Sequence, residues 1–587
     1  MTDTLSPPEK LAALRAVLAR DGVQGFLLTR GDAHLGEYVA PDSERLAWLT
    51  GFTGSAGCAV VLAERAMVFS DGRYVLQLET QTDGTVWERG HMIELPPERW
   101  AAAAAPGARI GYDPRLISAE MLARFERAGL VMVALDHNPV DAVWTDRPAP
   151  PLAPALPHEA RFSGRDSEDK RRAIAAMIAE SGADAVVLTD PASIAWLLNI
   201  RGSDVPCTPI AQGFAILRAD ASVTLYMAPE KLPETTRAWL GNAVATAAPE
   251  RMAADLAALA GQRVRVDPAG SAVWFAQALR AAGATVVDGP DPVLLPKARK
   301  NAVEQEGARS AHLRDGIALA KFLHWLDANA AATSEIGAIE ALDGFRAEAA
   351  EFRGNSFDAI SGAGPDGAII HYRVTPETDR LIGADTVYLI DSGAQYPDGT
   401  TDVTRTVWTG PSPAPDEVAD AATRVLQGHI ALAAAIFPKG TTGIRLDALA
   451  RLPLWRAGLD YDHGTGHGIG SFLAVHEGPC SISPRSPPVP LEPGMILSDE
   501  PGYYRPGGFG IRAENLLLVG EHTPDGRFLA FETLTLAPFD RRLIATALLS
   551  PDERDWIDRY HARVLAQIGP HVPDAVRAWL ASACAPL

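Results

Sequence analysis

Five side chains within residues 387–516 have the types and spacing of a metal site. The segments VYLIDSGAQYPDGTTDVTRT and MILSDEPGYYRPGGFGIRAENL each show the pattern strand, Gly/Pro-rich turn, strand. Their arms carry Asp391 and Asp402 in the first hairpin, and Glu500 and Glu514 in the second. Each pair is nearly equidistant from its turn, so we predict that its two acids face each other across the ladder at roughly 5 Å.

Four carboxylates that converge in a protein core would repel one another unless cations neutralise them. The Val-, Leu- and Ile-rich strands that carry these acids are of the buried type, so we predict bound divalent ions. Between the hairpins lies the stretch GTGHGIG, whose His467 would complete a mixed oxygen and nitrogen shell suited to Mn²⁺, Co²⁺ or Zn²⁺. We expect the glycines of this stretch to let the backbone approach the metals closely.

Length and composition limit the class of protein that must position this site. A chain of 587 residues is too long for one core and predicts about three or four domains. The formal net charge of −20 argues against a nucleic-acid partner, and the lack of an apolar run near 18 residues argues against a membrane partner. Four scattered cysteines and an amino terminus without a secretory pattern predict a cytoplasmic protein.

Composition shifts along the chain predict its organisation. Residues 1–144 alternate helical and strand-like runs and form an α/β domain, and the Pro/Ala-rich residues 145–160 form a linker. A second α/β domain covers residues 161–297, and the catalytic domain covers residues 298–587. The similar openings ARDGVQGFLLTR and AESGADAVVLTD suggest that the two α/β domains are copies of one module.

Two helices are expected to frame the catalytic domain. Residues from 298 onward repeat apolar side chains at helical spacing, which indicates a packing role. Near the carboxyl terminus, Trp556, Tyr560 and Val564 recur at four-residue intervals. We predict that this amphipathic helical extension docks on its own domain rather than on a second subunit.

The order Asp391, Asp402, His467, Glu500, Glu514 resembles the five-ligand dinuclear site of the pita-bread metallopeptidases, which include methionine aminopeptidase, prolidase and aminopeptidase P. The wording FRGNSFDAISGAGPDGAIIHY, DSGAQYPDGTTDVTRT, HGTGHGIGSFLAVHEGP and LSDEPGYYRPGGFGIRAENL is similar to the long, three-domain, cytosolic form of Xaa-Pro aminopeptidase. The match runs through nearly the whole chain. It implies two creatinase-like α/β domains followed by an α+β pita-bread domain.

The resemblance also implies a role for each ligand. Asp391 chelates one ion, Asp402 and Glu514 bridge both ions, and His467 with Glu500 completes the second. Two such ions share a water and lower its pKa toward neutrality, so hydrolysis by a bridging hydroxide needs no nucleophilic side chain. Glu500 would also guide the proton of that hydroxide toward the departing proline nitrogen.

Five further residues match family positions around the peptide site. The resemblance implies that His371 and His476 hydrogen-bond the substrate and the developing oxyanion, and that His463 lines the proline pocket. Arg512 and Tyr504 would support the Asp391 ligand. One departure lies close by, because GAGPDGAII carries Pro365-Asp366 where we expect Asn at the second position.

The resemblance implies removal of the amino-terminal residue from peptides with proline at position two, with two divalent ions, Mn²⁺ first among them. It also implies a homodimer, with peptides as the other partners. An Xaa-Pro dipeptidase of the same fold is one alternative, and the length of the chain argues against it. A binding protein that has lost catalysis, or a metal-free creatinase, are others, and the full set of five ligands argues against both.

Overall fold

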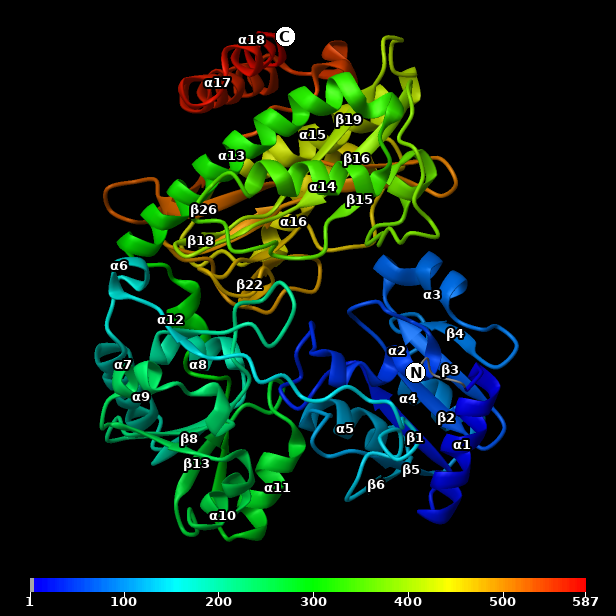
Figure 1. The fold of residues 1–587 in the computed structure, drawn as a ribbon, viewed down its shortest axis with the longest axis vertical. Helices are drawn as coiled ribbons and strands as arrows, with labels where there is room; N and C mark the ends of the chain where they lie inside the picture. Colours follow the sequence, from blue (N-terminus) through cyan, green and yellow to red (C-terminus); the bar gives the residue numbers. More distant parts are fainter. Residues whose placement is uncertain (1–4) are drawn as a thin grey trace. The chain divides into compact units, whose positions relative to one another are not determined.

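The computed structural model describes residues 5–587, which form two compact units (Figure 1). The first unit comprises the chain up to Ala160 together with Arg165–Leu294, and the second comprises Arg161–Gly164 with Leu295–Leu587. The first four residues of the predicted N-terminal domain lie outside the described residues. Within residues 5–587, every helix is too short or too polar to cross a membrane.

The first unit contains two six-stranded sheets with one topology. The first sheet has the order β4-β3-β2-β1-β5-β6 and the second the order β12-β11-β10-β8-β13-β14. In both, the third strand in this order is antiparallel to its two neighbours, and all remaining pairs are parallel. This agreement confirms the predicted duplication of an α/β module.

The strands of the first sheet are β1 (Gly25–Thr29), β2 (Cys58–Leu62), β3 (Ala66–Ser70), β4 (Glu88–His91), β5 (Arg109–Tyr112) and β6 (Val131–Ala134). Those of the second are β8 (Ala185–Leu188), β10 (Phe214–Arg218), β11 (Val223–Tyr226), β12 (Val244–Ala247), β13 (Arg263–Val266) and β14 (Thr285–Asp288). The helices around them include α1 (Pro7–Arg20), α5 (Ala119–Arg127), α7 (Ser167–Glu180), α8 (Pro191–Leu198) and α11 (Val273–Ala281). The predicted linker contains the short strand β7 (Leu156–Pro157).

The second unit is built on two larger sheets. One has the order β15-β16-β19, from β15 (Ile360–Ala363), β16 (Thr386–Ser392) and β19 (Val403–Thr409). The other has the order β20-β27-β26-β23-β21-β22, from β20 (Ile436–Pro438), β21 (Gly466–Gly468), β22 (Glu477–Ile482), β23 (Ile496–Asp499), β26 (Asn515–Glu521) and β27 (Phe528–Thr533). Short ladders β17 (Gln395–Tyr396) with β18 (Gly399–Thr400), and β24 (Gly502–Arg505) with β25 (Phe509–Arg512), close the two hairpins.

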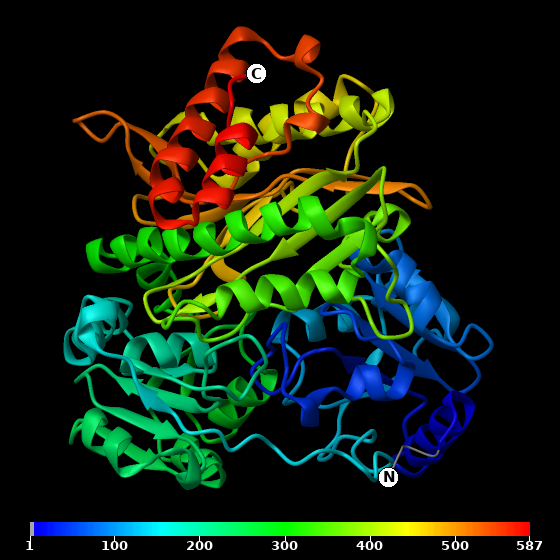
Figure 2. The ribbon, with the colours of Figure 1, turned by 45° about the horizontal axis from the view of Figure 1, so that its top comes forward.

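The helices of the second unit pack around these sheets (Figures 1 and 2). The helices are α12 (Leu294–Ala298), α13 (Ala302–Asn329), α14 (Glu335–Arg346), α15 (Asp416–Ala433), α16 (Gly443–Trp455), α17 (Pro551–Ile568) and α18 (Asp574–Ala583). Buried residues of α13 and α14 share a core with β16 and β19, whereas α15 and α16 share one with β23, β26 and β27. The predicted long helix after residue 298 is α13, and a capping box of Asn301 and Glu304 fixes its start.

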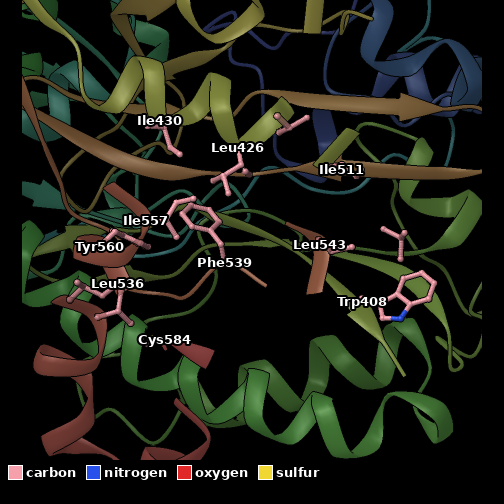
Figure 3. Close-up of a cluster of buried hydrophobic side chains, with 14 of the residues drawn as sticks. Trp408, Leu426, Ile430, Ile511, Leu536, Phe539, Leu543, Ile557, Tyr560 and Cys584 are labelled. Carbon is pink, nitrogen blue, oxygen red and sulfur yellow. The ribbon is translucent and has the colours of Figure 1, made fainter. Parts of the chain in front are cut away.

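The C-terminal helix docks on its own domain, as predicted (Figure 3). Ile557, Tyr560 and Val564 of α17 are buried in the cluster that contains Phe539 and Leu426. The Tyr560 hydroxyl also donates to the Ala537 carbonyl over 2.8 Å. A Ser550 capping box and Pro551 at the first helical position explain where this helix begins.

A buried ion pair links helices α13 and α14 to the first hairpin. Arg346 of α14 is fully buried, and its Nε lies 2.8 Å from Asp315 Oδ1 of α13. Arg346 Nη2 donates to Ser392 Oγ at 3.1 Å, and Thr401 Oγ1 donates to Asp315 Oδ2 at 3.0 Å. Ser392 and Thr401 neighbour Asp391 and Asp402, so this pair fixes the backbone on both arms of the hairpin.

Replacing Arg346 by Met should therefore destabilise the second unit by about 3–5 kcal/mol, because it leaves the Asp315 carboxylate buried without its partner. Urea unfolding followed by tryptophan fluorescence measures the change. The control is Arg424→Met, which breaks the half-buried Arg424–Asp420 pair within α15 and should cost less than about 1 kcal/mol. Equal midpoints for the two variants would contradict this role of Arg346.

Candidate metal centre

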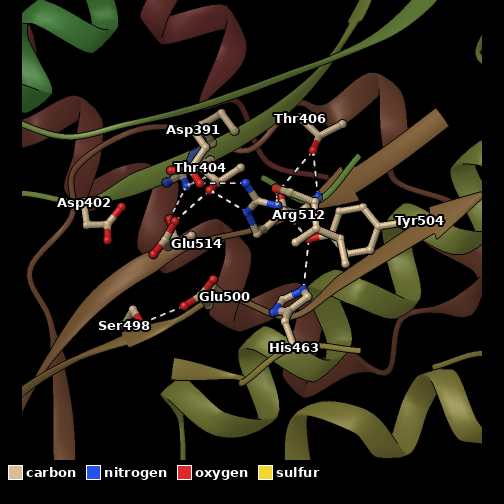
Figure 4. Close-up of polar contacts among 12 residues, drawn as sticks. Asp391, Asp402, Thr404, Thr406, His463, Ser498, Glu500, Tyr504, Arg512 and Glu514 are labelled. Atoms are coloured by element: carbon tan, nitrogen blue, oxygen red, sulfur yellow. Dashed lines mark hydrogen bonds and ion pairs between the residues drawn. The ribbon is translucent and has the colours of Figure 1, made fainter. Parts of the chain in front are cut away.

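The first hairpin places its two acids on adjacent strands, but not directly opposite each other. Asp391 on β16 pairs with Thr404 on β19, so Asp402 lies two positions from the residue opposite Asp391. The expected directly facing pair is therefore wrong for this hairpin. The turn itself lies at Pro397-Asp398, between the paired Tyr396 and Gly399, as predicted. Asp402 directly precedes β19, and both acids still lie in one cluster of polar side chains (Figure 4).

The second hairpin keeps the predicted register. Asp499 pairs with Asn515 in the β23–β26 ladder, and Gly502 pairs with Arg512 in the β24–β25 ladder. Glu500 and Glu514 occupy the break between these ladders at matching positions. The break frees both carboxylates from the regular alternation of the strands, which lets them turn toward the first hairpin.

The acids of the two hairpins come together in the interior (Figure 4), and His467 lies beside them. Ligand atoms of Asp402, His467 and Glu514 all lie within 4.8 Å of one another. His467 Nε2 is 3.6 Å from Asp402 Oδ2 and 3.4 Å from Glu500 Oε1. The set thus gathers imidazole nitrogen and carboxylate oxygens around one point, which is the chemistry that borderline and hard divalent ions accept.

The electrostatics of the cluster show why it calls for cations. Burial, together with the charges of Glu514, Asp391 and Glu500, raises the pKa of Asp402 well above its usual value. Burial, together with the charges of Asp391 and Glu500, raises the pKa of Glu514 well above its usual value, and burial raises that of Glu500 to about 7. Asp391 Oδ1 is also buried, with no hydrogen-bond partner among residues 5–587. A donor set of this kind fits divalent cations.

The glycines around His467 lie close to the backbone of neighbouring strands. A Cβ atom at Gly466 would lie 2.0 Å from the Ser498 carbonyl oxygen, and one at Gly468 would lie 2.2 Å from that of Glu477. These carbonyls belong to the flanking strands β23 and β22. This close approach lets β21 carry His467 between two strands, and the approach of these glycines to the metals stays a prediction.

Arg512 links the first hairpin to the predicted peptide site. Its Nη2 donates to Asp391 Oδ2 at 2.6 Å and its Nε to Thr404 Oγ1 at 3.1 Å. Its Nη1 donates to the Tyr504 hydroxyl at 2.7 Å, and that hydroxyl lies 2.9 Å from His463 Nε2. The dashed lines in Figure 4 trace this network. Arg512 and Tyr504 thus support Asp391 and His463 by contacts that the structure shows.

The other two histidines also lie beside this network. His476 packs edge-on against His467, with ring centroids 4.3 Å apart. His371 follows Ile370, whose carbonyl accepts a hydrogen bond from Arg512 Nη1 at 3.3 Å. The structure therefore brings every predicted site residue into one connected region, while the roles of these residues stay predictions.

Several supporting residues were not predicted from the sequence. Thr404 Oγ1 donates to Glu514 Oε2 at 2.6 Å, and Ser498 Oγ donates to Glu500 Oε1 at 3.1 Å. Thr404 lies two residues after Asp402, and Ser498 two residues before Glu500, so their closeness in sequence to predicted ligands was an available signal. The Thr404 hydroxyl thus orients one oxygen of Glu514, and the Ser498 hydroxyl orients one oxygen of Glu500.

A second unpredicted set lies behind the cluster. Arg405 Nη2 donates to Asn515 Oδ1 at 2.8 Å, which leaves Asn515 Nδ2 to donate to His429 Nε2 at 3.0 Å. His429 Nδ1 then carries the proton and donates toward the Asp499 carbonyl at 3.0 Å. Asn515 and Asp499 adjoin Glu514 and Glu500, so this chain of hydrogen bonds fixes the backbone of both acids.

Glu477, next to His476, lies in a buried network of its own. Lys297 Nζ is 3.0 Å from Glu477 Oε2 and Lys300 Nζ is 2.5 Å from Glu477 Oε1, and all three side chains are buried. Both lysines come from the short segment that leads into α13. Nothing in the local sequence pattern marks them as partners of a residue on β22.

Comparison with known families matches nearly the whole chain. Residues 306–521 match the model of metallopeptidase family M24, and residues 527–587 match the C-terminal region of peptidase M24. Residues 10–138 and 146–304 each match a Creatinase/Prolidase N-terminal domain. Among individual proteins, a probable Xaa-Pro aminopeptidase P of Laccaria bicolor is 40% identical over 100% of this chain and 94% of its own length. Aminopeptidase P1 of Lotus japonicus is 36% identical over 98% of this chain and 99% of its own length.

Solved structures agree with the family models. The X-prolyl aminopeptidase of Caenorhabditis elegans, described as a cytosolic enzyme with a di-nuclear active site, superposes with a TM-score of 0.94. It is 34% identical and covers 99% of this chain and 100% of its own. An Xaa-Pro dipeptidase of Bacillus anthracis shares the fold over 64% of this chain and 99% of its own, at 24% identity and a TM-score of 0.53. The chain therefore belongs to metallopeptidase family M24, with two Creatinase/Prolidase N-terminal domains ahead of its pita-bread catalytic domain.

Proposed function

We propose that this chain is a metal-dependent aminopeptidase that hydrolyses the bond between an amino-terminal residue and a penultimate proline. The observation that carries the proposal is the buried cluster of carboxylates around His467, in a chain similar over its full length to Xaa-Pro aminopeptidases. The cluster supplies the chemistry of a metallohydrolase, and the relatives supply the substrate class.

Five residues would hold two divalent ions in this proposal: Asp391, Asp402, His467, Glu500 and Glu514. We propose Mn²⁺ ahead of Co²⁺ or Zn²⁺, all of which accept this donor set. Such ions, when bound, lower the pKa of a water and polarise a carbonyl oxygen. The hydroxyls of Thr404 and Ser498 and the guanidinium of Arg512 would keep the carboxylates oriented toward the ions.

The remaining roles belong to side chains that face the substrate. A bond before proline is a tertiary amide without an N–H, so the site must recognise it through its carbonyl oxygen and its ring. His371 and His476 would donate hydrogen bonds to that oxygen as negative charge develops on it. His463, fixed by the Tyr504 hydroxyl, would line the pocket for the ring. Glu500 would pass a proton to the departing proline nitrogen.

Peptides with proline at position two are the proposed partners, together with a second copy of the chain in a homodimer. We also propose a cytoplasmic location, supported by the description of the nematode enzyme as cytosolic. The domain boundaries at residues 144, 160 and 297 belong to the same proposal, and the matches to residues 10–138 and 146–304 support them in outline.

An Xaa-Pro dipeptidase is the competing enzyme, since dipeptidases share the catalytic fold. The Bacillus anthracis dipeptidase leaves about a third of this chain unmatched, whereas the aminopeptidases match it from end to end. A binding protein without catalysis is the competing non-enzyme. The substrate test below separates all three.

After chelation and Mn²⁺ restoration, the protein should release the first residue of an Xaa-Pro-Xaa tripeptide, and Glu514→Ala should reduce kcat/KM by at least about 100-fold. Glu521→Ala, which truncates an exposed acid on the same strand, is the matched control and should keep full activity. Liquid chromatography of the products measures both rates. Cleavage of an Xaa-Pro dipeptide alone would favour the dipeptidase, and no turnover with any metal would favour the binding protein.

Tyr504→Phe should lower kcat/KM for the tripeptide about 10- to 100-fold with unchanged metal content, because His463 and Arg512 lose the hydroxyl that joins them. Tyr503→Phe on the same strand is the control, since the Tyr503 ring packs against Phe509 and should tolerate loss of the hydroxyl. Steady-state kinetics and elemental analysis of both variants test this. Similar kinetics for the two variants would exclude the proposed role of the Tyr504 hydroxyl.

Metal binding should release protons, because the pKa values of Asp402 and Glu514 are raised while the ions require ionised carboxylates. The apparent affinity for Mn²⁺ should thus increase by about tenfold or more per pH unit between pH 5 and 7. Calorimetry in two buffers of different ionisation enthalpy counts the protons released. Glu514→Gln should release fewer protons, and a pH-independent affinity would contradict the expectation.

A further inference from the structure

The short segment that carries His463 has no regular backbone structure to hold it. Residues 459–465 lie between the end of α16 and the start of β21, outside any helix or strand. The position of such a segment depends on side-chain contacts rather than on a ladder of backbone hydrogen bonds. Two buried residues of α16, Asp447 and Arg451, supply these contacts from neighbouring turns of the helix.

Arg451 directs most of its hydrogen bonds to this segment. Its Nε donates to Asp447 Oδ2 at 2.7 Å, which makes a buried ion pair within α16. Its Nη2 donates to the His463 carbonyl at 2.6 Å, and its Nη1 donates to the Tyr461 carbonyl at 2.7 Å and to Asp460 Oδ1 at 2.9 Å. A guanidinium can make all these contacts at once because its donors form a rigid planar fork. Arg451 thus fixes the backbone at several points up to His463.

Two tyrosine rings pack against the imidazole of His463. Tyr461 is buried, and its ring centroid lies 4.7 Å from that of His463. The Arg451 guanidinium lies 3.9 Å from the centroid of the Tyr461 ring, a cation–π contact. The Tyr504 ring meets His463 edge-on at 5.4 Å, and its hydroxyl is 2.9 Å from His463 Nε2 (Figure 4). A shift of Arg451 would therefore move Tyr461 and His463 together.

The hydrogen bonds of His463 make its imidazole a wall of the site rather than a donor to a ligand. Its Nδ1 lies 2.7 Å from the Gly464 carbonyl, which can only accept, so Nδ1 carries the proton. Nε2 of the neutral ring then accepts from the Tyr504 hydroxyl, whose oxygen accepts from Arg512 Nη1 at 2.7 Å. Both ring nitrogens are engaged, so His463 would meet a proline ring through its carbon atoms. Recognition of that kind depends on fit, and fit depends on where the imidazole is held.

Asp447 extends the same support toward the metal centre. Its Oδ1 accepts from Thr465 Oγ1 at 2.6 Å, so the Tyr461 hydroxyl, which lies 2.6 Å from the same Oγ1, is the donor in that second contact. The Thr465 carbonyl accepts from the Glu500 backbone N–H at 2.8 Å. One buried ion pair on α16 therefore holds both the proposed proline pocket and the backbone of a proposed metal ligand.

We propose that Arg451 is a specificity-determining positioning residue, which holds His463 where the pocket fits the five-membered ring of proline. This inference rests on the proposed function, because it takes peptides with proline at position two as the substrates. Arg451 acts through the His463 carbonyl and the Tyr461 ring, since its own side chain is buried. Without its planar fork the segment is free to shift, and the pocket then accepts rings of other sizes.

The test compares kcat/KM for two tripeptides that differ only at position two, one with proline and one with its six-membered homologue, pipecolic acid. One methylene in a fitted pocket changes kcat/KM by about 10- to 200-fold, so the metal-loaded wild type should prefer proline by a factor in this range. Arg451→Gln should reduce this preference by at least about fivefold. Partial unfolding of a variant lowers both rates equally and leaves their ratio unchanged. A wild-type ratio near one, or equal ratios in the wild type and Arg451→Gln, would overturn the proposal.

Two further variants separate position from charge. Arg451→Lys keeps a positive charge beside Asp447 but cannot reach both carbonyls, so it should show the same reduced preference as Arg451→Gln. Recovery of the wild-type preference by Arg451→Lys would mean that Arg451 only neutralises Asp447, and it would overturn the positioning role. Arg445→Gln, which changes an exposed arginine on the same helix, is the matched control and should keep the wild-type ratio.

Removal of Arg451 alone leaves the Asp447 carboxylate buried without its partner, which can prevent folding. In that case the double variant Asp447→Asn with Arg451→Gln replaces Arg451→Gln, because the Asn side chain carries no charge and still offers Thr465 an acceptor. Failure of the wild type to cleave the proline tripeptide would reject the proposed function, and this inference with it. Cleavage with the same ring preference in the wild type and the variants would reject the inference alone.

Discussion

Mutual repulsion among Asp391, Asp402, Glu500 and Glu514 is the constraint on which the catalytic unit depends. A flexible chain would relieve this repulsion by turning the acids outward to water. Here Asp391 lies in the middle strand of its sheet and the other three acids directly adjoin paired strands, so the backbone holds the four carboxylates close together. The fold stores an unfavourable arrangement that cations relieve, and this is how a pita-bread domain makes a preorganised metal site out of ordinary hairpins.

The supports around the cluster act on the backbone more than on the ligands. The pair Arg346–Asp315 holds the first hairpin, and the chain of hydrogen bonds from Arg405 to His429 holds the second. Only a few donors, such as Thr404 and Arg512, touch a carboxylate directly. Most carboxylate oxygens of the site are thus left open for ions and substrate. The packing of α13 to α16 supplies the rigidity.

Local patterns carried most of what could be predicted from the sequence. The duplicated α/β modules, the C-terminal helix and the residues of the candidate site follow from periodicity, turn signals and family wording. The prediction that Asp391 and Asp402 lie directly opposite each other was wrong, because Asp391 pairs with Thr404. Near-symmetry of two residues about the turn at Pro397-Asp398 does not fix the register of the strands. The lysines that support Glu477 could not be predicted, since they come from a distant segment that meets β22 only after the sheets have packed.

The lysines that hold Glu477 constrain the order in which the protein can be assembled on the ribosome. Lys297 and Lys300 follow the last residue of the first unit almost at once, whereas Glu477 lies 180 and 177 residues further along the chain. Translation needs roughly 10–40 s to cover that distance. The N-terminal modules have this time to fold while the lysines stay in water. The catalytic unit can bury its entry segment only once β22 has been synthesised, which makes its closure a late event.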